Sequence, residues 1–206
     1  NNLNTREKDK HGTYIQRRVA RDDFGTNPCS EIILRSREFC NLSEVVVRHN
    51  DTLQSLRSKV RIATILGTMQ STLTNFKYLS KEWQRNCEEE RLLGVSLTGI
   101  MDSPLTNGTK DNTKKVLNEL REVAVNTNIE YADKLGINRS VSITCVKPSG
   151  TVSQLVDSSS GIHARHNPYY IRTVRADNKD PLCKMMKAKG FPNEPDVTKP
   201  DHTSVF

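Results

Sequence analysis

The sequence has few aromatic residues and no long hydrophobic run. Each shortage argues against a class of protein function. Phenylalanine, tyrosine and tryptophan together make up 5% of the 206 residues. Basic runs interleaved with stacking side chains are missing, so a platform for single-stranded nucleic acid is poorly supported. No apolar run approaches the roughly 20 residues that a membrane span needs. We therefore expect neither a membrane protein nor direct binding of nucleic acid.

Cysteine spacing argues against two further classes. The five cysteines are an odd number without C-x-x-C spacing, which speaks against a secreted disulfide framework and against a zinc module. His163 and His166 are three residues apart, but the nearby Pro168 and the lack of a third ligand make a metal site the weaker interpretation. We expect a cytoplasmic protein without a bound metal ion.

The hydrophobic content is also low, at 34% of residues with a mean hydropathy of −0.63. A chain of this size can bury a core of its own, but this composition is typical of a piece whose core is completed by other segments. The chain starts at Asn1 instead of Met and ends on the apolar pair Val205 and Phe206. We expect both ends to be internal to a longer protein. The net charge of +7 favours anionic ligands such as polyphosphates.

Hydrophobic periodicity predicts strands that alternate with helices. Helices are expected over 51–78, 81–91, 110–135 and 181–189, and strands near 32–34, 45–47, 92–100, 141–146 and 169–174. Asp51 or Thr52 can cap the first of these helices, and Gly136 is placed to end the third. The alternation predicts an α/β fold with parallel strands. We expect residues 1–24 to form a charged connector or surface segment and 25–206 to form the domain.

The stretch 25–47 gathers side chains that suit catalysis. If residues 26–34 are extended, then Asn27, Cys29 and Glu31 face the same side at a spacing of about 6 to 7 Å. A thiol flanked by an amide and a carboxylate is a chemical set, whereas a buried structural cysteine needs neither neighbour. The spacing alone supports a catalytic and a structural cysteine about equally.

A second set, at 149–153, follows the predicted strand 141–146. Gly150 permits close approach of the backbone, and the hydroxyls of Ser149, Thr151 and Ser153 can donate hydrogen bonds. The N-terminus of a following helix would add free N–H groups and a positive dipole end, which suits an anion. An ordinary strand-to-helix turn with a threonine cap fits the bare pattern at least as well, and the spacing is not that of a Walker loop.

These segments carry a resemblance to a known family. Asn-Pro-Cys-Ser-Glu-Ile at 27–32, followed by Glu-Phe-Cys-Asn-Leu-Ser-Glu-Val at 38–45, resembles the active-site loop of ribonucleotide reductases, most of all the monomeric adenosylcobalamin-dependent (class II) ribonucleoside-triphosphate reductases. Val-Lys-Pro-Ser-Gly-Thr-Val-Ser at 146–153 and the run from 161 to 172 follow the same pattern. The resemblance implies half of a ten-stranded α/β barrel, with parallel strands and a central finger loop that carries the active-site cysteine.

The resemblance also implies a role for each matching residue. Cys29 would become a thiyl radical that removes the 3′ hydrogen of the substrate, with Glu31 as the base on the 3′ hydroxyl and Asn27 hydrogen-bonded to the sugar. Cys40 would be one half of a redox pair whose other half lies upstream of this chain. The substrate phosphates would contact Ser149, Gly150, Thr151 and Ser153.

An intact enzyme of this kind would reduce ribonucleoside triphosphates for DNA synthesis. The resemblance implies adenosylcobalamin as the source of the radical, a thioredoxin-type dithiol as the reductant, and a monomeric protein. The isolated chain would be inactive because the partner of Cys40 is missing. We expect Cys87, Cys145 and Cys183 to be structural, and the pair Tyr169-Tyr170 to serve in packing.

Three alternatives remain open from the sequence. The chain could come from the large subunit of a class I reductase, which shares the Asn-x-Cys-x-Glu loop but needs a radical-generating partner. It could be a basic nucleotide-binding or nucleic-acid-binding module without catalysis. It could also be a remnant that does not fold by itself, which a cooperative melting curve would contradict.

Overall fold

A computed structural model describes residues 6–8, 14–19 and 23–206. The chain divides into two compact units, Asn1–Arg165 and His166–Phe206. All the residues singled out above as catalytic or phosphate-binding lie in the first unit. None of the helices in the described part of the chain is both long enough and apolar enough to cross a bilayer.

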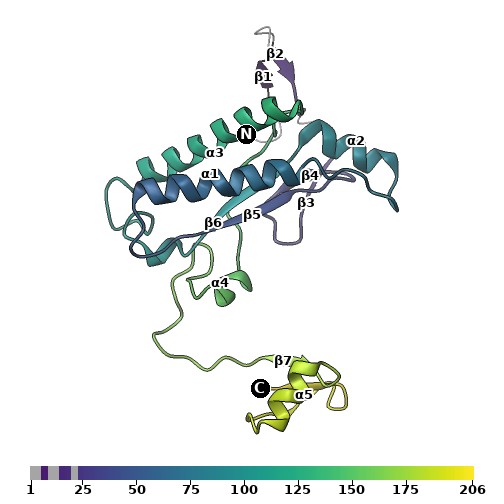
Figure 1. The fold of residues 1–206 in the computed structure, drawn as a ribbon, viewed down its shortest axis with the longest axis vertical. Helices are drawn as coiled ribbons and strands as arrows, with labels where there is room; N and C mark the ends of the chain where they lie inside the picture. The colour runs from purple at the N-terminus through teal and green to yellow at the C-terminus, as the bar shows by residue number, and fades with distance from the viewer. Residues whose placement is uncertain (1–5, 9–13, 20–22) are drawn as a thin grey trace. The chain divides into compact units, whose positions relative to one another are not determined.

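The first unit is built on two parallel strands, β5 (Asn41–Val46) and β6 (Leu93–Thr98), which pair with Asn41 opposite Leu93. A parallel bridge between Val95 and Thr144 adds a third segment beside β6, where the sequence predicts a full strand over 141–146. Helices α1 (Leu53–Gln70) and α3 (Thr113–Leu135) lie side by side along these strands (Figure 1). The prediction of an α/β fold with parallel strands is confirmed for this unit.

The two faces of the parallel pair have different chemistry because side chains alternate along a strand. One face meets the helices, and the core there consists of Val45, Val47, Leu56, Val60, Ala63, Val95, Val116, Leu120 and Ala124. The opposite face, called the inner face below, carries Leu42 and Glu44 from β5 together with Gly94 and Ser96 from β6. The helices therefore anchor one face and leave the other for polar groups.

The helix ends follow their local sequence. Thr52 caps α1 in a capping box with Ser55, each side chain accepting from the backbone N–H of the other residue. Helix α3 ends at Gly136, which has a left-handed φ of 65°. The helix predicted over 51–78 is wrong in its last part, because α1 ends at Gln70 and residues 73–76 are irregular.

The remaining elements of the first unit are short. Strands β1 (Arg6–Lys8) and β2 (Tyr14–Gln16) form one antiparallel hairpin, and β3 (Phe24–Thr26) and β4 (Ile33–Arg35) form another. The others are α2 (Lys81–Glu90), the 3₁₀ turn η1 (Ile100–Asp102) and the single turn α4 (Val152–Leu155). Residues 26–34 are thus two short strands and a loop, and the continuous extended segment considered from the sequence is not present.

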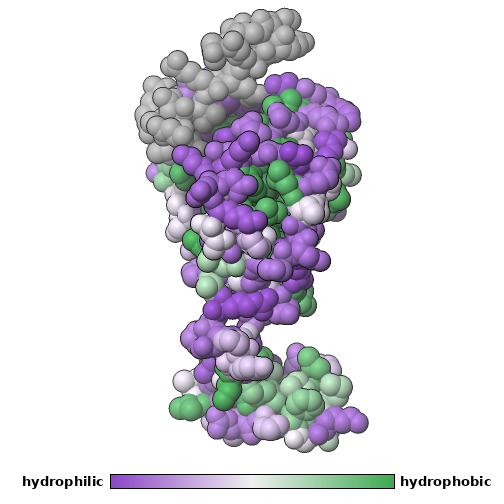
Figure 2. Space-filling model, turned by 90° about the vertical axis from the view of Figure 1, so that its left-hand side faces the viewer, coloured by the Kyte–Doolittle hydropathy of each residue, from purple (hydrophilic) through white to green (hydrophobic). Residues whose placement is uncertain are grey.

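The second unit is a small sheet with one helix. Strands β7 (Arg175–Asp177), β9 (Thr203–Val205) and β8 (Glu194–Pro195) are antiparallel in that order, and α5 spans Pro181–Ala188. The predicted strand over 169–174 is wrong, since this segment is irregular and exposed. The tyrosine pair does not pack as expected, because Tyr169 is 92% exposed. The face in Figure 2 is mostly hydrophilic with scattered hydrophobic patches, as the composition leads one to expect.

A buried group of charges ties the β3–β4 hairpin to α2. The Arg18 guanidinium donates to Glu90 Oε2 from Nε at 2.8 Å and to the carbonyl oxygen of Ile33 at 3.0 Å. Arg35 Nε lies 3.0 Å from Glu90 Oε1, and the Arg35 backbone N–H donates to Glu38 Oε2 at 2.9 Å. Arg18, expected from the sequence to lie in a charged connector or surface segment, is buried together with Glu90.

Burial and the neighbouring Glu90 raise the pKa of Glu38 from 4.5 to about 8. The folded protein therefore keeps a proton that the unfolded chain releases above its ordinary pKa. We expect the free energy of unfolding to fall between about pH 5 and pH 8, by at most about 1.4 kcal/mol per pH unit. Glu38→Gln removes the titrating proton and keeps an acceptor for the Arg35 N–H, so the slope should flatten in urea titrations at several pH values. Glu122→Gln, on an exposed part of α3, is the control. An unchanged slope in Glu38→Gln would contradict the assignment.

Candidate active site

The loop between β3 and β4 is closed by the side chain of Asn27. The Asn27 side-chain Oδ1 accepts the backbone N–H of Ile32 at 3.0 Å. The backbone carbonyl oxygen of Asn27 accepts the backbone N–H of Ser30 at 2.9 Å. Ser30 has a left-handed φ of 61°, which turns the chain sharply at this point. Asn27 therefore holds the loop with its side-chain and backbone oxygens, and its side-chain Nδ2 amide is available as a donor.

The loop places the three predicted catalytic residues on a turn rather than along one strand face. Cys29 is exposed at the tip of the loop, and Asn27 and Glu31 are half-buried. Glu31 Oε2 is itself buried and has no hydrogen-bond partner among the described residues. A carboxylate oxygen in this state can accept a hydrogen bond from a ligand hydroxyl.

The base of this loop rests on the inner face of the parallel strands. A Cβ added to Gly94 would lie 2.5 Å from Leu42 Cδ2, 3.1 Å from Cys145 Sγ and 3.2 Å from Ile32 Cδ1. Three segments far apart in the sequence thus converge at a residue that has no side chain. The absence of a side chain at Gly94 lets the loop, β5 and the segment at Cys145 approach each other.

Two thiols share this inner face with Glu31. Burial, with smaller contributions from nearby Cys145 and Glu31, raises the pKa of Cys40 to about 12. Burial and Glu31 likewise raise the pKa of Cys145 to about 11. The structure thus brings Glu31, Cys40 and Cys145 together, and Cys145, expected from the sequence to be merely structural, belongs to this region. Cys87 is buried close to Cys40: the Phe39 backbone N–H donates to Cys87 Sγ at 3.4 Å, and both cysteines line one small cavity. Cys183 is buried in the second unit.

The predicted phosphate segment is an irregular loop followed by one helical turn. Ser149 is buried with a left-handed φ of 59°, and its Oγ has no hydrogen-bond partner among the described residues. Ser153 is fully buried and its Oγ donates to the Gly150 carbonyl oxygen at 3.4 Å, while Gly150 and Thr151 are exposed. The expected contribution of a helix dipole is not supported, because α4 has four residues and its aligned peptide dipoles are too few.

A loop from residue 158 to residue 161 holds this segment against the end of β6. The Ser159 carbonyl oxygen accepts the N–H of Gly99 at 2.9 Å, and Ser160 Oγ donates to the Pro148 carbonyl oxygen at 2.7 Å. Gly161 has a φ of 54°, and a Cβ there would lie 2.5 Å from the Lys147 carbonyl oxygen. The position of the phosphate segment therefore depends on close backbone contact at Gly161.

Sequence reasoning missed several polar residues of this region. The hydroxyls of Ser158 and Ser159 are buried without a partner in the described structure, and so are both carboxylate oxygens of Glu44. The strand pattern offered one signal for Glu44: it is two residues from apolar Leu42 and would share its face. The two serines gave no signal, because an isolated pair in a loop is ordinary.

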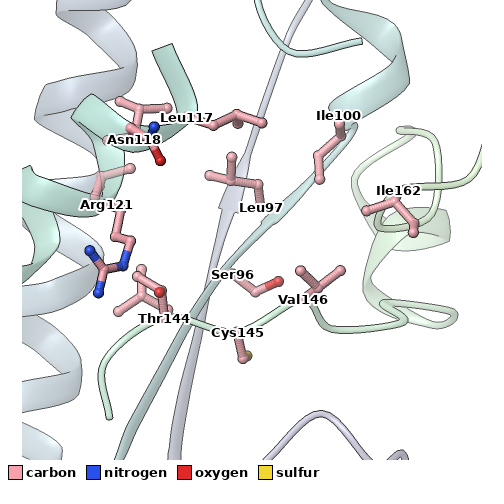
Figure 3. A pocket seen from close by; sticks show the side chains of 13 residues that line it. Ser96, Leu97, Ile100, Leu117, Asn118, Arg121, Thr144, Cys145, Val146 and Ile162 are labelled. Carbon is pink, nitrogen blue, oxygen red and sulfur yellow. The ribbon is translucent and has the colours of Figure 1, made fainter. Parts of the chain in front are cut away.

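The largely apolar cavity in Figure 3 adjoins this region but does not contain the predicted catalytic residues. It has a volume of about 330 Å³ and lies between α3, β6 and the segment 144–146. Its lining includes Cys145 and Ser96, but Asn27, Cys29, Glu31, Cys40 and the phosphate segment 149–153 do not contribute to it. In the described residues, no group of three or more histidine, cysteine or acidic side chains could hold a metal ion.

The raised pKa values predict unequal thiol reactivity. The thiolate is the nucleophile, and at pH 8 a thiol with a pKa of about 12 is about one part in ten thousand ionised. We expect iodoacetamide to alkylate exposed Cys29 at least about tenfold faster than Cys40 or Cys145 in the native chain. Peptide mass spectrometry over a time course measures this, and a urea-unfolded sample, where the rates should converge, is the control. Equal rates in the native chain would contradict the raised pKa values of Cys40 and Cys145.

The backbone contact at Gly161 predicts a large cost for a methyl group there. Gly161→Ala should lower the free energy of unfolding by about 1–2 kcal/mol for the left-handed φ and by about 1–3 kcal/mol more for the overlap with Lys147. Gly108→Ala is the matched control, because Gly108 has a φ of 82° and open space around it. Urea denaturation of both variants gives the difference. Equal losses would show that the contact with Lys147 does not constrain the loop.

Comparison with known proteins indicates the family of the chain. No family model matches the chain. The adenosylcobalamin-dependent ribonucleoside-triphosphate reductase of Lactobacillus delbrueckii subsp. bulgaricus is 30% identical, over 89% of this chain and 28% of the relative. Proteins of the same name in Levilactobacillus brevis and Euglena gracilis are 31% and 29% identical, over 84% and 88% of this chain and 26% and 24% of the relatives. The chain thus spans about a quarter of the length of these relatives.

A solved structure gives the same result. The crystal structure of a B12-dependent (class II) ribonucleotide reductase matches with a TM-score of 0.67 and 27% sequence identity, covering 88% of this chain and 28% of that one. The similarity in sequence and in structure therefore extends over nearly the whole chain. On these grounds the chain belongs to the ribonucleotide reductase family and is most similar to its class II, adenosylcobalamin-dependent members.

Proposed function

We propose that this chain is part of an enzyme that reduces ribonucleoside triphosphates to 2′-deoxyribonucleoside triphosphates by thiyl-radical chemistry at Cys29. The observation that carries the proposal is the hairpin loop: its exposed thiol projects from a turn whose base lies against the inner face with Glu31 and Cys40. The similarity to class II reductases favours this assignment over the large subunit of a class I enzyme.

The loop residues would divide the first steps of the reaction. A thiyl radical at Cys29 takes a hydrogen atom from C3′ of the substrate, which regenerates the thiol and leaves a carbon radical on the sugar. Glu31, whose buried Oε2 lacks a donor, takes the proton of the 3′ hydroxyl. The Nδ2 amide of Asn27 donates to the sugar, because the Oδ1 is engaged with Ile32. A rigid loop suits this task, since a radical must meet one C–H bond and no other.

Cys40 would supply reducing equivalents. The 2′ hydroxyl leaves as water, and two thiols together give two hydrogen atoms and become a disulfide, so that one ribonucleotide and two thiols yield one deoxyribonucleotide, water and the disulfide. The raised pKa of Cys40 keeps its hydrogen on sulfur at neutral pH, which suits hydrogen-atom delivery. We assign its partner cysteine to another part of the enzyme and re-reduction to a thioredoxin-type dithiol.

The phosphate segment would hold the other end of the substrate. Ser149 presents a buried hydroxyl without a hydrogen-bond partner among the described residues. The N–H groups of Gly150 and Thr151, before α4, and of Val152, its first residue, have no acceptor within that helix. Hydroxyl and N–H donors of this kind suit phosphate oxygens. Ser153 contributes chiefly by fixing the turn through Gly150.

Adenosylcobalamin fits this chain at one point. When bound, it supplies the one-electron oxidation that converts the Cys29 thiol into a radical, and the exposed position of Cys29 leaves room for a bulky group to approach. None of the described side chains is assigned to holding it.

The wider arrangement we propose is half of a ten-stranded barrel, with β5, β6 and the segment at Thr144 as neighbouring strands and the β3–β4 loop as the central finger. The parent enzyme would be a cytoplasmic monomer, and the chain by itself would be inactive.

Paired substitutions in a full-length reductase that contains this chain test the proposal. Cys29→Ser should abolish turnover, because an alcohol O–H is much harder to convert into a radical than a thiol S–H. Cys40→Ser should instead stop multiple turnover and leave at most about one product per enzyme. Cys183→Ser is the control, since this cysteine lies in the second unit. Product is counted by chromatography with adenosylcobalamin and no second subunit. Multiple turnover by Cys29→Ser would overturn the proposal.

A further inference from the structure

The inner face contains an acid–base pair to which nothing above assigns a role. Glu44 on β5 lies opposite Ser96 on β6, and Ser96 Oγ accepts the backbone N–H of Lys147 at 3.0 Å. Glu44, Ser96 and Lys147 therefore form one polar row across three neighbouring segments. The Lys147 ammonium nitrogen lies 3.9 Å from Glu44 Oε2.

The hydrogen-bonding capacity of this row is largely unused. The Glu44 side chain is 8% exposed, and neither of its oxygens has a hydrogen-bond partner in the described structure. A buried carboxylate without donors is unfavourable, and an ion pair at 3.9 Å lacks the short contact that normally offsets desolvation. The Lys147 side chain is 26% exposed, so its ammonium reaches from the row towards solvent.

The row adjoins both predicted ends of the substrate site. Lys147 is two residues before Ser149, the first residue of the phosphate segment. On the other side, the Cys145 thiol is affected electrostatically by Glu31 as well as by Lys147 and Glu44. A nucleotide that extends from Glu31 to Ser149 would therefore pass the ammonium at the junction of its sugar and phosphates. Since phosphate oxygens accept and do not donate, they suit Lys147 and not Glu44.

We propose that Lys147 binds the substrate phosphate nearest the ribose and that Glu44 is the positioning residue that holds its ammonium in place. This inference rests on the proposed function, which supplies the nucleotide. An ammonium has three donors, so Lys147 can contact Glu44 and a phosphate oxygen together. The buried carboxylate favours one direction of a flexible side chain that would otherwise sample many rotamers.

The test compares ligands that differ by that one phosphate. In a full-length reductase containing this chain, dissociation constants are measured by competition with a labelled ribonucleoside triphosphate, so that inactive variants remain informative. The competitors are the same nucleoside without phosphate, its 5′-monophosphate and its triphosphate. Lys147→Gln should weaken the monophosphate and the triphosphate by the same factor, about tenfold or more, and leave the unphosphorylated nucleoside unchanged.

Companion variants separate positioning from folding. Glu44→Gln should show the same ligand pattern with a smaller factor, and Lys147→Arg should restore part of the monophosphate affinity. Lys115→Gln removes an exposed charge of the same sign from α3 and should change none of the three constants. The inference is overturned if Lys147→Gln binds the monophosphate as wild type does, or if the bare nucleoside loses affinity by the same factor. Cys29-dependent turnover alongside either result would leave the proposed function standing and remove this inference alone.

Discussion

The hairpin that carries Cys29 depends on a buried cluster of charges. Arg18 contacts both the Glu90 carboxylate and the Ile33 carbonyl oxygen, so one guanidinium joins the end of α2 to β4. Arg35 completes the cluster from the strand side by pairing with Glu90, and its backbone N–H donates to the Glu38 carboxyl group. Two strands of three residues cannot be stable alone in water. The ion pairs are buried, where removing one partner is far more costly than on the surface, and so they determine where the loop lies.

The two faces of the β5–β6 pair carry different side chains, apolar on one and polar on the other. This difference explains how so polar a chain forms an ordered site. Helices α1 and α3 bury the valine-rich face of β5 and β6, and this face supplies the hydrophobic stabilisation. The inner face can then carry Glu44, Ser96 and two thiols. Gly94 has no side chain, and this allows Ile32 and Cys145 to approach the β6 backbone closely. The loop that carries Cys29 and the segment 149–153 thus meet a common surface although more than 100 residues separate them.

The environment of each thiol separates its chemistry from that of its neighbours. Cys29 is exposed on a turn, where a radical-generating group can reach it. Cys40 is half-buried, and desolvation together with nearby acidic groups raises its pKa and keeps its hydrogen on sulfur. The same residue type therefore serves two roles in the proposed reaction, one in starting it and one in supplying hydrogen, because burial and electrostatics differ over eleven residues.

The sequence by itself determined the helices, the parallel α/β class and the family, because capping residues, apolar periodicity and an ordered set of motifs are local properties. Thr52 and Gly136 bound their helices as their chemistry predicts. Only the tertiary structure decided that Asn27, Cys29 and Glu31 lie on a turn, that Glu90 and Arg18 are buried, and that Cys145, Glu44 and Lys147 face the site. Such features arise from contacts between segments distant in sequence, for which hydrophobic periodicity carries no information.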